Sequence, residues 1–203
     1  MDNFLQSVYV GEVKKQAIFS IHAILALNQA LRALNDPRNT GEQRKQLHAE
    51  VFRQTHSFLT HASNVSRLFW PPKLNRKRGE SNEDYKQRVQ FTRERGTKLR
   101  ALFAITEQSP LKSRDLRDHL EHYDERLDHW SNTSQHRNIC SDTIGPPNAI
   151  VGLAPTDMMR WFDPTTNSFL FRGESYALQP LATEISILPE KADALEQALQ
   201  NRC

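Results

Sequence analysis

The chain of 203 residues has little cysteine and little glycine, and it has no long uninterrupted apolar run. Its two cysteines, Cys140 and Cys203, are too few for a disulfide framework or a four-ligand structural zinc site. Seven glycines and ten prolines exclude a collagen-like or low-complexity chain. Because no stretch of about 18 uncharged apolar residues stands out, and charged residues interrupt the first fifteen positions, we expect neither a membrane span nor a signal peptide. These absences favour a cytoplasmic protein.

The apolar residues that are present, 37% of the chain, recur mainly at helical spacing. Prolines and capping-box patterns, Thr40 with Gln43 and Ser81 with Asp84, mark where helices should stop and start. Ser109-Pro110 is a further start signal. The expected helices run from about Phe4 to Leu34, from Thr40 to Pro71, from Ser81 to Leu102 and from Ser109 to Trp130.

The last third of the chain has a different pattern. Residues 131–155 are rich in Ser, Asn, Thr, Gly and Pro, which is typical of a long connection. Two β-prone runs follow, Met159–Phe162 and Phe169–Arg172, with a third short run at Ser175–Leu178. A final helical stripe extends from residue 181 to residue 199, and Pro189 should kink or split it.

The sequence therefore predicts a mainly α fold. We expect an up-and-down bundle of four to five helices with a small β-hairpin or meander and a C-terminal helix. The predicted divisions are a helical bundle over residues 1–135, an irregular connection over 136–157, and a hairpin with a C-terminal helix packed on the bundle over 158–203.

Charge is segregated along the chain. Between Lys73 and Arg100 lie ten basic and four acidic residues, a net charge of +6, so the remainder carries −3 although the whole chain carries only +3. Such a segment attracts polyanions, and each phosphate that it neutralised would add salt dependence to binding. The alternative is a solvated helix face beside a basic loop. The expected nucleic-acid contacts are Arg76, Lys77, Arg78, Arg88, Arg93 and Arg95.

The densest group of chemically active side chains lies between Arg114 and Trp130. On a regular helix, Asp115, His119, His122 and Arg126 would share one flank. Histidine titrates near neutrality and arginine matches phosphate geometry, so the combination suits acid–base cleavage of a phosphodiester. Two alternatives are ion pairs that only solvate the helix, such as Arg117 with Glu121 and Asp118 with His122, and a metal site on Asp115, His119 and His122.

Arg117-Asp118, three residues and then His122 resemble the signature of HEPN domains, in which an arginine and a polar residue precede a histidine by four to six positions. The resemblance implies a homodimeric, metal-independent endoribonuclease without a cofactor, in which two such motifs share a cleft. His122 would be the acid–base group, Arg117 would stabilise the transition-state charge, and Asp118 would orient its neighbours. A second frame consists of Arg114, Asp115 and His119.

The same resemblance implies a role in a toxin–antitoxin or phage-defence system, with RNA as substrate and an antitoxin protein as partner. One geometric difficulty accompanies it. Arg117 and His122 are five positions apart, so an ideal helix would separate their directions by about 140° unless it were distorted. The alternative function is a non-catalytic helical interaction or RNA-binding protein.

Overall fold

The structure, a computed structural model, describes residues 1–201; Cys203 lies outside them. The chain is mainly helical and carries a small four-stranded sheet. The helices are α1 (Asn3–Leu34), α2 (Gly41–Phe69), α3 (Asn82–Phe103), α4 (Asp115–Glu121), α5 (Tyr123–Thr133), α6 (Leu178–Ser186) and α7 (Leu188–Gln200). Short 3₁₀ turns cover Pro110–Lys112 and Pro155–Asp157.

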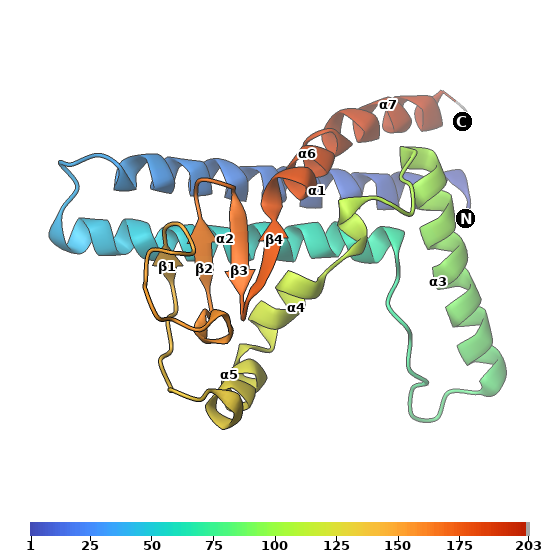
Figure 1. Cartoon of the computed structure of the whole chain (residues 1–203). Helices are drawn as coiled ribbons and strands as arrows, with labels where there is room; N and C mark the ends of the chain where they lie inside the picture. Colours follow the sequence, from blue (N-terminus) through green and yellow to red (C-terminus); the bar gives the residue numbers. More distant parts are fainter. Residues whose placement is uncertain (202–203) are drawn as a thin grey trace.

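Two long helices form the frame of the molecule. α1 and α2 run side by side in opposite directions, and α7 lies against the N-terminal half of α1 (Figure 1). Asp2 caps α1, because its carboxylate accepts a hydrogen bond from the backbone N–H of Leu5 at 2.8 Å. The contact face of α1 carries small and branched residues, including Val10, Val13 and Ala17, all fully buried. α1 ends at Leu34 and α2 ends at Phe69, close to the ends predicted from sequence, Leu34 and Pro71.

α1 is also long and apolar enough to cross a membrane, with a window of mean hydropathy 1.4, contrary to the expectation that no segment would qualify. The interior of a soluble protein can satisfy the same criterion, and α1 packs against α2, α6 and α7. Length and composition alone are weak evidence for a membrane span.

The sheet has the strand order β1-β2-β3-β4 and lies over the middle of α2 (Figure 1). β1 (Thr143–Ile144) pairs in parallel with β2 (Trp161–Asp163); β3 (Ser168–Phe171) and β4 (Glu174–Ala177) add antiparallel strands. Phe162, Phe169 and Phe171 join the main core, whereas Trp161 and Leu170 belong to a small second cluster on the other side. The predicted strands β2 to β4 are confirmed, and β1 is an addition from the segment expected to be irregular.

Two predicted helices are interrupted in the structure. The last one breaks at Ile187 into α6 and α7, with Pro189 in the first turn of α7, as expected. The predicted helix from Ser109 to Trp130 is wrong in two respects: Ser109-Pro110 opens only a 3₁₀ turn, and the helix that follows breaks at His122 into α4 and α5. The capping box predicted at Thr40 also fails, since its side chain makes no cap hydrogen bond, whereas Ser81 accepts from Asp84 N as predicted.

Candidate functional site

The break at His122 determines how the motif residues are arranged. His122 has φ −101° and ψ 38°, and α5 turns away from the line of α4 (Figure 1). Its N–H still donates to Asp118 O at 3.1 Å, and its C=O accepts from Arg126 N at 3.1 Å, so the backbone bonds bridge the bend. The expected common flank of Asp115, His119, His122 and Arg126 is therefore present only in part: Arg126 bonds to His119 and also lines a surface hollow with His122, but His119 does not line that hollow. Arg117 lines it together with His122.

This hollow, which we call the arginine hollow, has a volume of about 480 Å³ and lies between the end of α2 and the α4–α5 bend. Four arginines contribute to it against two carboxylates, so it carries a positive charge. Arg67 comes from α2, a contribution that local sequence did not indicate. The lining residues are Arg67, Pro72, Arg114, Arg117, Asp118, His122, Glu125 and Arg126.

Arg117 is held firmly at the inner side of the hollow. Its side chain is only 11% exposed, and its guanidinium pairs with Asp118 at 3.0 Å and also with Glu121. The Arg117–Glu121 ion pair is the one predicted from sequence under the alternative in which these side chains only solvate the helix. The Nε of Arg117 is nevertheless buried without a hydrogen-bond partner among residues 1–201. An unpaired buried donor of this kind is costly unless a ligand or water satisfies it.

His122 is the accessible member of the motif. Its side chain is 54% exposed, and its Nδ1 lies 3.4 Å from Glu125 Oε1. Within residues 1–201, the side chains of Asp118 and His122 do not form the ion pair that was the alternative prediction. Asp118 pairs with Arg117 instead. An accessible imidazole beside fixed guanidinium groups can exchange a proton with a phosphodiester bound in the hollow.

The second frame, Arg114 with His119, is divided between two environments. Arg114 lines the arginine hollow and donates to Trp70 O at 3.2 Å. His119 lies on the other side of α4, stacked on Phe171 with ring centroids 4.9 Å apart and an interplanar angle of 11°. The imidazole and guanidinium of this frame therefore line different parts of the surface.

A chain of hydrogen bonds fixes His119. Arg126 Nε donates to His119 Nδ1 at 3.1 Å, which leaves the proton of the neutral ring on Nε2, facing Tyr176 Oη at 3.1 Å. Tyr176 donates in turn to Glu174. Burial, and then the charge of Arg126, lower the pKa of His119, while burial and Glu174 raise the pKa of Tyr176. Local sequence around the motif carries no signal for Tyr176 or Glu174, because both come from β4, far along the chain.

The alternative of a metal site is wrong for the described part of the chain. Within residues 1–201, no three His, Cys, Asp or Glu side chains lie close enough together to hold a metal ion. Asp115 accepts from Ser113 Oγ at 2.8 Å, His119 faces Tyr176, and His122 faces Glu125. The three expected ligands therefore have separate partners.

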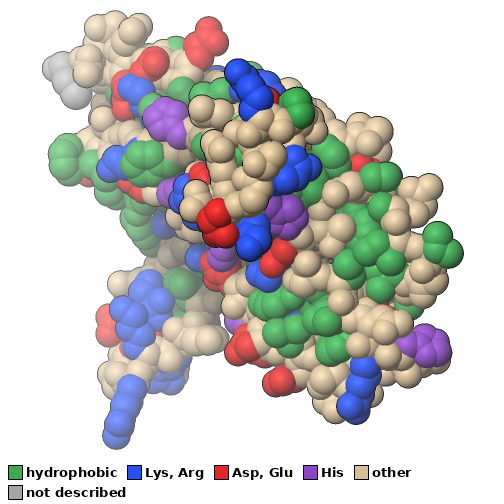
Figure 2. Space-filling view, turned by 90° about the vertical axis from the view of Figure 1, so that its left-hand side faces the viewer, with side chains coloured by type: hydrophobic (Ala, Val, Ile, Leu, Met, Phe, Trp, Pro, Cys, Tyr) green, Lys and Arg blue, Asp and Glu red, His purple; other side chains and the backbone are tan. Residues whose placement is uncertain are grey.

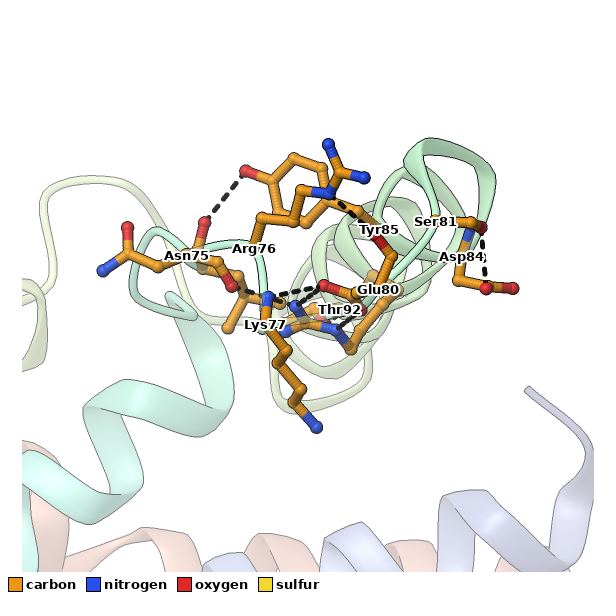
Figure 3. A network of polar contacts seen from close by, with 10 residues as sticks. Asn75, Arg76, Lys77, Glu80, Ser81, Asp84, Tyr85 and Thr92 are labelled. Carbon is orange, nitrogen blue, oxygen red and sulfur yellow. Dashed lines mark hydrogen bonds and ion pairs between the residues drawn. The ribbon is translucent and has the colours of Figure 1, made fainter.

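The basic segment forms a projecting lobe built from residues 70–82 and the start of α3, where Lys and Arg side chains gather (Figure 2). Glu80 organises this lobe. Its carboxylate accepts from Arg88 Nε at 2.7 Å and from Lys77 N at 2.9 Å, and Arg76 Nε donates to its carbonyl at 2.8 Å (Figure 3). The bonds to the carboxylate, from Arg88 first and then from the Lys77 N–H, lower the pKa of Glu80 to about 2.

The six arginines and lysines predicted to contact nucleic acid fall into two groups. Arg76 and Arg88 hold the lobe together, and Arg95 donates to Arg67 O at 3.1 Å while its guanidinium lies over the Tyr9 ring. Lys77, Arg78 and Arg93 are exposed, and none of their side-chain cations has a partner among residues 1–201. The sequence predicted the charge of the lobe but not this division.

Comparisons with models of protein families, with curated proteins and with solved structures found no match to this chain.

Proposed function

We propose that the chain is a HEPN-like, metal-independent endoribonuclease that acts as a cytoplasmic homodimer, in a toxin–antitoxin or phage-defence setting with an antitoxin protein as partner. One observation carries the proposal: the bend at His122 brings Arg117 and His122 to one positively charged hollow. The expected bundle is part of the proposal, with the antiparallel α1–α2 pair as its frame and α4–α5 carrying the motif.

In the proposed reaction, a phosphodiester of RNA lies in the arginine hollow. The ribose 2′-hydroxyl attacks phosphorus, a base removes its proton, and the bond to the departing 5′-oxygen breaks as that oxygen gains a proton. The products are a 2′,3′-cyclic phosphate and a 5′-hydroxyl. His122 performs one proton transfer, and the guanidiniums of Arg114 and Arg117 face the charge that develops on the phosphorane.

The number of acid–base groups supports the proposed homodimer. The arginine hollow of one chain contains a single histidine, whereas the reaction needs one proton removed and one delivered. Two copies whose hollows face each other would supply two imidazoles. Asp118 holds Arg117 at 3.0 Å and keeps its role as an orienting group in this scheme.

The test is cleavage of single-stranded RNA by the purified protein in the presence of EDTA. We expect cleavage with cyclic phosphate ends, and we expect His122→Ala to lower the rate by about 100-fold or more. Because the His122 side chain is half exposed, the Tm of the His122→Ala variant should differ little from that of the wild type. His136→Ala is the matched control, since His136 is an exposed histidine outside the hollow.

A second candidate function is RNA binding without cleavage. The two carboxylate partners of Arg117 favour it, because they already neutralise the guanidinium that would stabilise the transition state. Intact RNA under all salt conditions, with retention of RNA in a mobility-shift experiment, would replace the nuclease proposal with this one.

A further inference from the structure

A second hollow lies next to the arginine hollow and differs from it in chemistry. It encloses about 350 Å³ between α2, the start of α4 and the junction of β4 with α6. Its walls are mainly aliphatic side chains, so we call it the aliphatic cleft. They include Leu59, Ala62, Leu111, Leu116, Leu178 and Leu181. The volume falls at the lower end of the range of about 300–1,000 Å³ in which small ligands bind.

Two residues that line this cleft, Ser63 and Arg117, each have a buried polar atom, Oγ and Nε, without a hydrogen-bond partner among residues 1–201. Ser63 is 3% exposed and lines the cleft, and its Oγ is buried without a hydrogen bond to any residue in the range 1–201. A buried hydroxyl normally finds a partner, because leaving it unpaired is unfavourable. The cleft therefore fits an occupant that carries oxygen atoms as well as an apolar body.

Two arginines and one carboxylate are among the residues that line the cleft. Arg114 and Arg117 line it together with Asp115. Arg117 is occupied by Asp118 and Glu121, and the Asp115 carboxylate accepts from Ser113 Oγ. Arg114 makes one hydrogen bond, to Trp70 O, which leaves most of its five N–H donors free for an anion.

The walls also indicate which kind of apolar group would fit. Nucleobases are usually held by stacking on aromatic rings. Among the lining residues the one aromatic side chain is Tyr176, whose hydroxyl is already bound to Glu174 and His119. Leucine, alanine and proline side chains surround the rest of the cleft, and they match an alkyl chain better than a planar base.

From these observations we propose that the aliphatic cleft binds a short aliphatic carboxylate, with its chain between the leucines and its carboxylate against Arg114. This proposal does not rest on the proposed ribonuclease function, although Arg114 and Arg117 line both the aliphatic cleft and the arginine hollow.

The test uses isothermal titration of the full-length protein with octanoate. We expect saturable binding of one octanoate per chain. Acetate, which lacks the chain, and inorganic phosphate should show no saturable binding at the same concentrations. Octan-1-ol, which lacks the charge, should bind about tenfold more weakly than octanoate. Arg114→Gln should reduce the affinity for octanoate by a similar factor and leave the affinity for octanol unchanged.

A second variant tests the location. Ala177 is exposed and lines the cleft, so Ala177→Trp should cover it without disturbing the core. We expect the affinity for octanoate to fall at least about tenfold, because the chain loses its apolar contacts. Thr183→Trp, at an exposed position of α6 outside the cleft, is the matched control and should bind octanoate normally. Circular dichroism and Tm verify that both variants fold.

Three results would overturn the proposal. Absence of octanoate binding would show that the cleft has no such ligand. Equal binding of octanoate to the wild type and to a folded Ala177→Trp would place the ligand elsewhere. Equal affinities for octanoate and octanol would show that the carboxylate charge does not contribute to binding. None of these readouts involves RNA, so they leave the ribonuclease proposal untouched.

Discussion

His119 and His122 are three residues apart, yet their surroundings give them different chemical properties. His122 is half exposed beside Glu125, whereas the His119 ring lies flat on Phe171 and its two nitrogens face Arg126 and Tyr176. The bond from Arg126 requires the unprotonated Nδ1. Protonation of His119 would therefore break that bond and place two cations side by side.

This environment predicts how stability depends on pH. Burial and Arg126 lower the pKa of His119 from its usual 6.5, so near that pH the unfolded chain binds a proton more readily than the folded chain. The stabilisation from neutral His119 is complete above pH 6.5 and is lost as the pH falls through 6.5 towards the lower folded pKa. We expect the free energy of unfolding, measured by urea denaturation, to decrease from about pH 7.5 to about pH 5.

His119→Gln should flatten this decrease. A smaller slope should remain, because burial also lowers the pKa of His61. His136→Gln, a change at an exposed position, should leave the wild-type slope unaltered. If His119→Gln and the wild type lose stability in parallel, His119 does not carry the effect.

The hydroxyl of Tyr176 gives a separate prediction. Tyr176→Phe removes the group between His119 and Glu174 and leaves the ring in place. We expect a loss of about 1 kcal/mol in the free energy of unfolding at neutral pH, the usual value of one such hydrogen bond. Chemical denaturation measures it. A variant as stable as the wild type would mean that water replaces the hydroxyl at no cost.

At the scale of helices, the close approach of α3 to the segment after α2 depends on Gly96. A Cβ at this position would lie 2.7 Å from Phe69 O and 2.6 Å from Pro71 Cδ. Arg100 binds the same carbonyl of Phe69 and stacks over Trp70, so the contact is held from both sides. Gly96 is therefore needed for packing, in spite of the low helix propensity of glycine.

Two glycine substitutions test this argument with opposite expected signs. Gly96→Ala should destabilise the protein by about 1–3 kcal/mol, because the clash with backbone outweighs the gain in helix propensity. Gly11→Ala in α1 should stabilise it by about 0.5–1 kcal/mol, since the new Cβ would lie at an ordinary 3.5 Å from Glu196 Oε1. Thermal unfolding of both variants provides the measurement. Similar shifts in the same direction would refute the packing role of Gly96.

Helix boundaries were predictable from sequence where the signals are local. Asp36-Pro37, Pro71-Pro72 and Pro189 act on their own neighbours, and the structure ends or divides helices beside each of them. The bend at His122 has no glycine or proline nearby. It coincides with contacts from distant segments: Arg160 lies over the Tyr123 ring, 4.4 Å from its centroid, and Trp130 donates to Asp157. Such tertiary contacts cannot be read from local sequence.

For the same reason, the candidate site was predictable only in part. The arginines and histidines of residues 114–126 are evident from their spacing, but which of them share a hollow depends on the bend. Arg67 reaches the arginine hollow from α2, whereas Tyr176 and Glu174 of β4 contact or lie beside His119, outside the hollow. Only folding brings these distant segments to the α4–α5 region.

At the scale of the whole molecule, the basic lobe and the arginine hollow are two cationic regions that would contact the same RNA strand in the proposed function. Pro72 lines the hollow, and the 70–82 segment continues directly from it to the lobe. We therefore expect a single strand of RNA that starts in the hollow to reach the cations of the lobe along this segment. Since Arg76, Arg88 and Arg95 hold the structure together, the free cations Lys77, Arg78 and Arg93 should provide the electrostatic contacts.

This division predicts the salt dependence of RNA binding. Each phosphate contact contributes a slope of about −0.7 to the plot of log binding constant against log salt concentration for single strands, because a counterion is released. Replacing Lys77, Arg78 and Arg93 together by alanine should reduce the magnitude of the slope by about 2 and leave Tm nearly unchanged. Replacing Arg76, Arg88 and Arg95 removes the same charge but should lower Tm, because those side chains hold the lobe and the end of α2. Fluorescence anisotropy with a labelled oligonucleotide at several salt concentrations measures the slope. If the variant with alanine at Lys77, Arg78 and Arg93 kept the wild-type slope, these three side chains would not contact the RNA, and the division of the six predicted residues would be refuted.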